Sequence, residues 1–411
     1  METKEKRPAK EVLRGVVDQV YQNAWDAKGR GELVGWSSSK FPQEIAETFG
    51  LAICYPENQA AAISAKKGGI RMCEHAESQG YANDICGYAR ISLAYADLGE
   101  AEEKDMPLPD FVLCCNNICN LMTKWYENIA RKLNIPLIMI DIPYNNDTTI
   151  GGDRVAYIKG QFDNAIKQLE ELTGKKWNEE KFQEVMATSN RTAKAWIKAC
   201  SFCQETPSPL SGFDLFNHMA VIVTARSKPE AADAFEQLAE EYEEAVKNGT
   251  STWRYEENHR IMFEGIPCWP ELRALFNPLK EKGINTTAVV YAPAFGFLYE
   301  NTEELMKAYC VCPTAVSLET AVGWREKLCR ENNVNGILVH YNRSCKPWSG
   351  FMPEMERRLR DNLGIAVAGF DGDQADPRNF SEAQYRTRVQ GLYEIMEANK
   401  AKAEVKDNGK A

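Results

Sequence analysis

The chain has 411 residues, of which 44% are hydrophobic and 26% are charged, and its formal net charge is -10. These proportions are typical of a folded globular protein and exclude a largely disordered chain. The negative charge disfavours general binding to nucleic acid or to a membrane surface, because both need basic residues. The longest apolar runs, such as residues 135–142, are far shorter than the roughly 20 residues of a membrane-spanning helix.

The beginning and the length of the chain predict its compartment and its organisation. The first fifteen residues, METKEKRPAKEVLRG, are charged and have no apolar core, so we expect no signal peptide and a cytoplasmic location. At roughly 100 to 200 residues per domain, a chain of this length is expected to form two or three domains.

The N-terminal part of the chain predicts a helix followed by an α/β domain. Residues 1–35 are predicted to be a helical segment, because Val12, Val16 and Val20 recur every four residues. Over residues 36–160, short apolar runs rich in β-formers alternate with helical stretches, which is typical of a parallel sheet with helices on both faces. The expected strands are residues 51–55, 111–115 and 137–141.

The rest of the chain predicts a helical segment over residues 161–260 and a second α/β domain over residues 261–399. Strand-like runs return at residues 287–292, 336–340 and 365–370. Residues 400–411 are polar and are predicted to be a flexible tail. The fold class is thus predicted as α/β, with two flavodoxin-like doubly wound parallel-sheet units, a helical N-terminus and a helical middle segment.

Two of the thirteen cysteines, Cys119 and Cys345, follow expected strands in a similar way. The strand at residues 111–115 leads into Asn-Asn-Ile-Cys and the strand at residues 336–340 leads, after one tyrosine, into Asn-Arg-Ser-Cys. Open α/β sheets bind ligands at the carboxyl ends of their strands. A free cysteine otherwise packs like a small hydrophobic residue, so this position distinguishes Cys119 and Cys345 from the others.

Three cysteines are enough to hold an iron–sulfur cluster that keeps one iron open for another ligand. Cys86 is the third candidate because its small and polar neighbours, in DICGY, favour a loop. A buried loop thiol is the alternative for Cys86. Cys200 and Cys203 have the spacing of half a zinc site or of a redox pair, but no second pair with that spacing exists, so we predict no metal there.

Glu57 and Ser39 are candidates for acid–base chemistry and substrate binding. Glu57 directly follows the strand at residues 51–55, so its carboxylate is expected at the same sheet edge as Cys119. The alternative is a carboxylate favoured by a helix N-terminus. Ser39 can donate a hydrogen bond to a substrate oxygen, or it can cap a helix. The sequence has no phosphate-binding glycine motif, which indicates that the chain does not itself hydrolyse ATP.

Eight stretches of the sequence carry a resemblance to a known family. They are VGWSSSKFPQEIAE, YPENQAAA, DICGYAR, LCCNNICN, KWYENIARKLNIPLIMIDIPYN, SPLSGFDLFNHMA, YNRSCK and GFDGDQADPRNFSEAQ. Together they closely resemble the α-subunit of the 2-hydroxyacyl-CoA dehydratases of anaerobic bacteria, over nearly the whole chain. The phenyllactyl-CoA type is more similar than the lactoyl-CoA type.

The resemblance implies a cofactor, a reaction and site residues. The family's α-subunit binds a 4Fe-4S cluster through three cysteines, and the matching motif positions are Cys86, Cys119 and Cys345. The family's serine and glutamate beside the cluster fall on Ser39 and Glu57, which implies roles in substrate binding and catalysis. The implied reaction removes water from an (R)-2-hydroxyacyl-CoA to give the (E)-2-enoyl-CoA, through a ketyl radical at the open iron.

The resemblance also implies two protein partners. One is a β-subunit with its own iron–sulfur cluster, and the other is an ATP-dependent iron–sulfur activator that binds transiently. Two alternatives stay open: a benzoyl-CoA reductase-type subunit, which would consume electrons stoichiometrically, and a non-catalytic iron–sulfur electron-transfer subunit with a fully ligated cluster. The preferred acyl group follows from similarity alone.

Overall fold

Two four-stranded parallel sheets form the framework of the computed structural model, which describes residues 7–145 and 148–408. The first sheet contains β1 (Val34–Ser37), β2 (Ala52–Cys54), β3 (Phe111–Cys115) and β4 (Leu137–Ile140), in the spatial order β2-β1-β3-β4. The second contains β5 (His259–Glu264), β6 (Ile284–Val289), β7 (Gly336–Asn342) and β8 (Ala366–Gly372), in the order β6-β5-β7-β8. Both orders are flavodoxin-like, which confirms the predicted fold class.

The strand β3 shows why this sheet needs helices on both faces. All five residues of β3 are buried, and they alternate between two hydrophobic clusters. Phe111 and Leu113 face the cluster under α2 (Gln43–Thr48) and α7 (Gly152–Thr173), whereas Val112 faces the larger cluster on the other side. A strand buried on both faces has a continuous apolar sequence, which made β3 recognisable.

Two strands, β1 and β5, are absent from the sequence prediction because they are not continuous apolar runs. In β1, Gly35 lies so close to the neighbouring strand that a Cβ atom there would meet the Phe111 ring at 2.5 Å. In β5, the polar residues at both ends are buried, and Glu264 is paired with Arg325. Burial of such residues depends on partners far along the chain, so local sequence does not reveal it.

Helices of the first unit and the N-terminal helix cover the first sheet. The helix α1 (Ala9–Gly29) packs against β2 and against two helices of the middle segment. The helices that follow α2 in this unit are α3 (Pro56–Ala65), α4 (Gly69–Ser78), α5 (Gly87–Leu98) and α6 (Leu121–Leu133).

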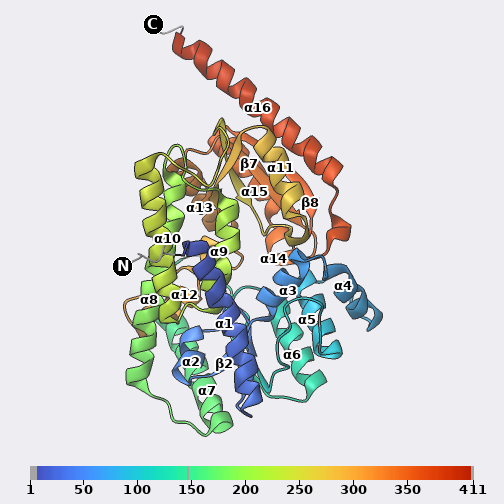
Figure 1. The fold of residues 1–411 in the computed structure, drawn as a ribbon, viewed down its shortest axis with the longest axis vertical. Helices are drawn as coiled ribbons and strands as arrows, with labels where there is room; N and C mark the ends of the chain where they lie inside the picture. Colours follow the sequence, from blue (N-terminus) through green and yellow to red (C-terminus); the bar gives the residue numbers. More distant parts are fainter. Residues whose placement is uncertain (1–6, 146–147, 409–411) are drawn as a thin grey trace, which may run out of the picture.

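The middle segment is helical, as predicted. It contains α7, α8 (Glu179–Ser201), α9 (Gly212–Thr224) and α10 (Pro229–Asn248), and Figure 1 shows α8 and α10 side by side. The helix ends have local caps: Gly174 and Gly249 adopt the left-handed conformation after α7 and α10, and the Asn178 side chain accepts the Lys181 N–H at the start of α8.

The second unit ends in a helix that extends past the rest of the chain. Its helices are α11 (Leu272–Glu281), α12 (Thr302–Tyr309), α13 (Leu318–Glu331), α14 (Lys346–Ser349), α15 (Met352–Leu363) and α16 (Glu382–Asn408). The first part of α16 packs on β8, and its last turns project away from the other elements (Figure 1). Residues 400–408 are thus helical, and residues 409–411 lie outside the described residues. The flexibility of this tail stays a prediction, and so do the expected domain boundaries. No helix within residues 7–145 and 148–408 is long and apolar enough to cross a membrane.

Candidate active site

A cavity of about 420 Å³ lies where loops from the carboxyl ends of both sheets meet. Segments that follow strands of the first sheet provide Ser39, Glu57 and Cys119, and segments that follow strands of the second sheet provide Tyr291, Cys345 and Gln374. The carboxyl edge of a doubly wound sheet is the usual location of a ligand site. Here two such edges share one cavity.

Four cysteines line this cavity: the buried Cys312 and, from three separate segments, Cys86, Cys119 and Cys345. Cys86, Cys119 and Cys345 are partly exposed, whereas nine of the thirteen cysteines, Cys312 among them, are buried. The remaining partly exposed cysteine, Cys200, is in α8 and does not line the cavity. The three thiols are close enough that negative charge on Cys86 or Cys119 raises the pKa of Cys345.

Backbone N–H groups at the starts of three helices point at these sulfur atoms. The Leu121 N–H donates to Cys119 Sγ at 3.4 Å, the N–H groups of Tyr88 and Ala89 donate to Cys86, and that of Trp348 donates to Cys345. Gln374 Nε2 also donates to Cys86 Sγ at 3.2 Å. Such donors favour the thiolate form and are a common feature around cluster sulfurs.

The surroundings of the thiols fit a positively charged cofactor. Burial raises the pKa of Cys86 to about 12, and burial also raises the pKa values of Cys119 and Cys345. Neutral thiols are therefore favoured unless a cation compensates three neighbouring thiolates. Within the described residues, no three His, Cys, Asp or Glu side chains are spaced to hold a single metal ion. A cluster places its own iron and sulfide atoms between the thiolates, so this thiol-rich lining fits an iron–sulfur cluster.

Glu57 lies in the cavity wall in the first turn of α3, and three hydrogen bonds hold its carboxylate. The N–H and Oγ of Ser39 both donate to Oε1, at 2.9 and 3.0 Å, and the Tyr126 hydroxyl donates to Oε2 at 3.0 Å. Burial nevertheless raises the pKa of Glu57 above its ordinary value. A buried carboxyl group with a raised pKa beside a cavity is suited to proton transfer.

The structure excludes one of the two alternatives for Ser39, the helix cap. The helix after Ser39, α2, begins at Gln43 with Pro42 at its cap position, so Ser39 does not cap it. Both hydrogen-bonding groups of Ser39 instead hold Glu57. Both alternatives for Glu57 are compatible with the structure, because Glu57 is in the first turn of α3 and also lines the cavity.

Lys40 is a cavity residue that sequence reasoning missed. Its side chain is only 2% exposed, and its Nζ donates to the Ala294 carbonyl at 2.7 Å and lies 4.4 Å from the centre of the Phe297 ring. Burial lowers the pKa of Lys40 to about 8. No local signal marks this lysine as buried, because its partners are about 250 residues away in the chain.

The Cys-x-x-Cys pair is located away from the cavity, where Cys203 is buried and its carbonyl accepts a hydrogen bond from Arg260. The acidic segment after β8 is a turn, in which Asp373 Oδ1 accepts the N–H groups of Ala375 and Asp376, at 2.8 and 3.0 Å.

A pair of doubly wound units that share a cavity lined with thiols and a partly buried carboxyl group is the architecture of an α/β protein with a ligand site between its sheets. Comparisons with known proteins narrow this class. A family model described as 2-hydroxyglutaryl-CoA dehydratase, D-component, matches residues 38–396. The chain therefore belongs to the 2-hydroxyacyl-CoA dehydratase family and corresponds to its α-subunits. It is accordingly a subunit of an enzyme of the hydro-lyase class.

Three similar relatives cover nearly the full length of both chains. The (R)-phenyllactyl-CoA dehydratase alpha subunit of Clostridium sporogenes is 59% identical, over 97% of this chain and 98% of the relative. The (R)-2-hydroxyglutaryl-CoA dehydratase subunit alpha of Acidaminococcus fermentans is 54% identical, over 96% and 98%. The (R)-2-hydroxyisocaproyl-CoA dehydratase alpha subunit of Clostridioides difficile is 48% identical, over 96% and 98%.

Proposed function

We propose that this chain is the α-subunit of an (R)-2-hydroxyacyl-CoA dehydratase that releases water and the (E)-2-enoyl-CoA, with phenyllactyl-CoA or a related aryllactyl-CoA as its substrate. The observation that supports this most is that Cys86, Cys119, Cys345 and Glu57 line one cavity. The family membership and the names of the relatives support the reaction class.

We propose that Cys86, Cys119 and Cys345 hold a 4Fe-4S cluster. When bound, such a cluster supplies a one-electron couple and one iron that no protein side chain occupies. The N–H groups and the Gln374 amide that face the sulfurs would offset part of the thiolate charge. The three ligands come from both sheet units, so the cofactor would lie between them.

In this proposal, Glu57 handles the proton that the departing 2-hydroxyl group needs. A hydroxyl group leaves as water only if its oxygen gains a proton, and the raised pKa lets Glu57 hold one closer to neutral pH than an ordinary carboxyl group does. The two hydrogen bonds from Ser39 fix Oε1, which directs the carboxyl group along the cavity wall. The apolar walls, including Phe295 and Trp348, keep bulk water away from this step.

We also propose that the chain acts in the cytoplasm with two protein partners, a β-subunit and an activator. The relatives are named as alpha subunits, which supports a β-subunit partner, and we propose that this partner carries a second cluster. We also propose a separate ATP-dependent iron–sulfur activator that supplies the first electron, and the lack of a phosphate-binding glycine motif in this chain fits that division of labour. All thirteen cysteines are free, which suits the reducing cytoplasm.

An anaerobic assay with the β-subunit and activator tests this function against its alternatives. We expect many molecules of enoyl-CoA for each electron supplied, and a change in the cluster spectrum when (R)-phenyllactyl-CoA is added. Consumption of reductant in proportion to product would instead support a benzoyl-CoA reductase-type reaction. A cluster spectrum that is indifferent to substrate would support an electron-transfer subunit.

A further inference from the structure

A second cavity, of about 180 Å³, lies between α3 and α9 and adjoins the thiol cavity. The two cavities have Ser39, Glu57, Tyr88, Tyr291 and Phe295 in common. These five residues line both cavities, so the two cavities are adjacent at Glu57. A substrate whose reacting carbon lies at Glu57 would have the thiols on one side and the α3–α9 cavity on the other.

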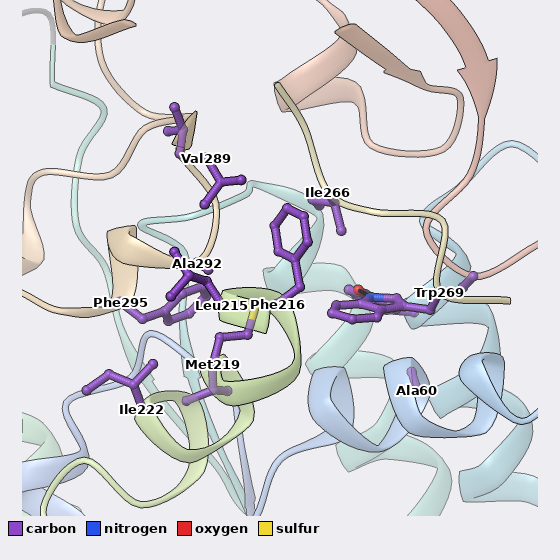
Figure 2. Packing of buried hydrophobic residues seen from close by; sticks show 14 of the residues in the cluster. Ala60, Leu215, Phe216, Met219, Ile222, Ile266, Trp269, Val289, Ala292 and Phe295 are labelled. Carbon is purple, nitrogen blue, oxygen red and sulfur yellow. Dashed lines mark hydrogen bonds between the residues drawn. The ribbon is translucent and has the colours of Figure 1, made fainter. Parts of the chain in front are cut away.

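The shape of the α3–α9 cavity follows from the sequence of its two helices. On α3, Glu57, Ala61 and Ala65 are four residues apart and therefore lie on one helix face, where the alanines leave space. The opposite wall is α9, which contributes Phe216 and Met219. Figure 2 shows Phe216 between Phe295 and Trp269, with Met219 below Phe216 and Ala60 of α3 below Trp269. The cavity lining is thus largely apolar, with the amides of Asn58 and Asn217 among its polar groups.

The charges of the two cavities differ. Within the part of the chain that the structure describes, Glu57 is the only charged residue that lines the α3–α9 cavity. The thiol cavity, in contrast, has three lysines in its lining, Lys40, Lys124 and Lys346, against the two carboxylates of Glu57 and Asp84. Lys124 and Lys346 are largely exposed, and Lys346 pairs with Asp84 at 3.6 Å. The lysine side suits the phosphate groups of coenzyme A, and the α3–α9 side suits a group without charge.

We propose that the α3–α9 cavity binds the acyl side chain of the substrate and selects aryl or branched aliphatic groups over side chains that carry a carboxylate. Apolar cavities of about 150 Å³ are known to take up benzene, so the volume suits a phenyl ring. A second carboxylate would be buried beside Glu57 without a cation to pair with it. This inference rests on the proposed function, and it separates the phenyllactyl and isocaproyl types from the hydroxyglutaryl type.

Equilibrium binding of thioesters that lack the 2-hydroxyl group tests the inference without turnover. We expect the anaerobic complex with the β-subunit to bind 3-phenylpropionyl-CoA at least about tenfold more tightly than glutaryl-CoA, measured by titration calorimetry. Equal affinity, or tighter binding of glutaryl-CoA, overturns the proposal. If the expected preference is found but (R)-phenyllactyl-CoA is not dehydrated, the proposed function fails and the acyl site stands.

Two substitutions with opposite effects place the preference in this cavity. Ala61→Phe fills it from the partly exposed face of α3, so we expect the affinity for 3-phenylpropionyl-CoA relative to propionyl-CoA to fall by about tenfold or more. Met219→Ala enlarges it, so binding of 3-(indol-3-yl)propionyl-CoA relative to 3-phenylpropionyl-CoA is expected to tighten. Ala156→Phe, at an exposed position of α7, is the matched control and should change neither ratio. Unchanged ratios in both cavity variants overturn the proposal.

Discussion

Glu57 is subject to two opposing influences at the residue scale. Burial raises the pKa of its carboxyl group, whereas hydrogen bonds from Ser39 and Tyr126 lower it, and the effect of burial is larger. The same hydrogen bonds fix the position of both carboxylate oxygens. If Glu57 transfers a proton, a side chain of the same size that lacks the acidic group cannot replace it.

The substitution Glu57→Gln keeps the size of the side chain and removes the acidic group. We expect turnover to fall by about 10²- to 10⁴-fold, the usual contribution of a positioned acid or base, while the iron content stays the same. Glu11→Gln, at an exposed position of α1, is the control. Near-normal turnover of the Glu57 variant, with iron still bound, would remove Glu57 from the mechanism.

Replacing Tyr126 with phenylalanine tests the protonation state in which Glu57 acts. The Tyr126 hydroxyl stabilises the ionised carboxylate, so its loss raises the pKa of Glu57 further. If protonated Glu57 is the active form, activity persists to higher pH, and the alkaline limb of kcat/KM shifts upward in Tyr126→Phe. The measurement is a pH profile of both proteins. A downward shift or an unchanged limb would contradict this assignment.

How far these residues are predictable depends on where their partners lie. Cys119 and Cys345 were identified from their positions after strands, whereas the pairing of Ser39 with Glu57 spans 18 residues and was not predicted. Gln374 contacts Cys86 across 288 residues, a contact that exists only once the two sheet units are in place. Lys40 and Gln374 were missed for this reason.

At the scale of elements, the short helix α14 is held by a buried network of Glu264, Arg325 and Trp348. Arg325 donates to both oxygens of Glu264, at 2.8 and 3.0 Å, and the Trp348 indole N–H donates to Oε1 at 2.9 Å. A helix of four residues is not stable alone. The network therefore fixes α14, and with it Cys345 at its first turn, to β5 and α13.

Breaking this network is expected to destabilise the fold strongly. Arg325→Met leaves Glu264 buried without its partner, so we expect the free energy of unfolding to fall by about 3–5 kcal/mol. The matched control on the same helix is Arg330→Met, whose pairing with Glu326 is largely exposed on the arginine side, and its expected cost is about 0–1 kcal/mol. Denaturant unfolding of both variants provides the comparison. Similar small losses in both would show that the buried pair does not hold the element.

Elements with strong local signals were predictable, and those defined by tertiary contacts were not. The ends of α7, α8 and α10 follow from Gly174, Asn178 and Gly249, because caps act within a few residues. The strand β6 was expected at residues 287–292 but spans Ile284–Val289. Its first residues include the buried polar side chains of Asn285 and Thr286, so the start of the strand has no apolar pattern in the sequence.

At the scale of the whole molecule, the chemistry lies between two sheet units of the same topology. Cys86 and Cys119 belong to the first unit and Cys345 to the second, and the Gln374 amide crosses from the second unit to Cys86. The alternation of strands and helices predicted both units. Their relative placement, and with it the shared cavity, depends on packing between segments more than 200 residues apart and was not visible in the sequence.

The most direct test of the proposed cluster ligands is the iron content, after anaerobic purification, of variants in which one cysteine is replaced by alanine. Cys86→Ala, Cys119→Ala and Cys345→Ala are each expected to lose most of the cluster iron, because each removes one of three protein ligands. Cys200→Ala, which changes a partly exposed thiol outside the cavity, is expected to keep it. Undiminished iron and an unchanged cluster spectrum in any of the first three variants would contradict the assignment of that ligand.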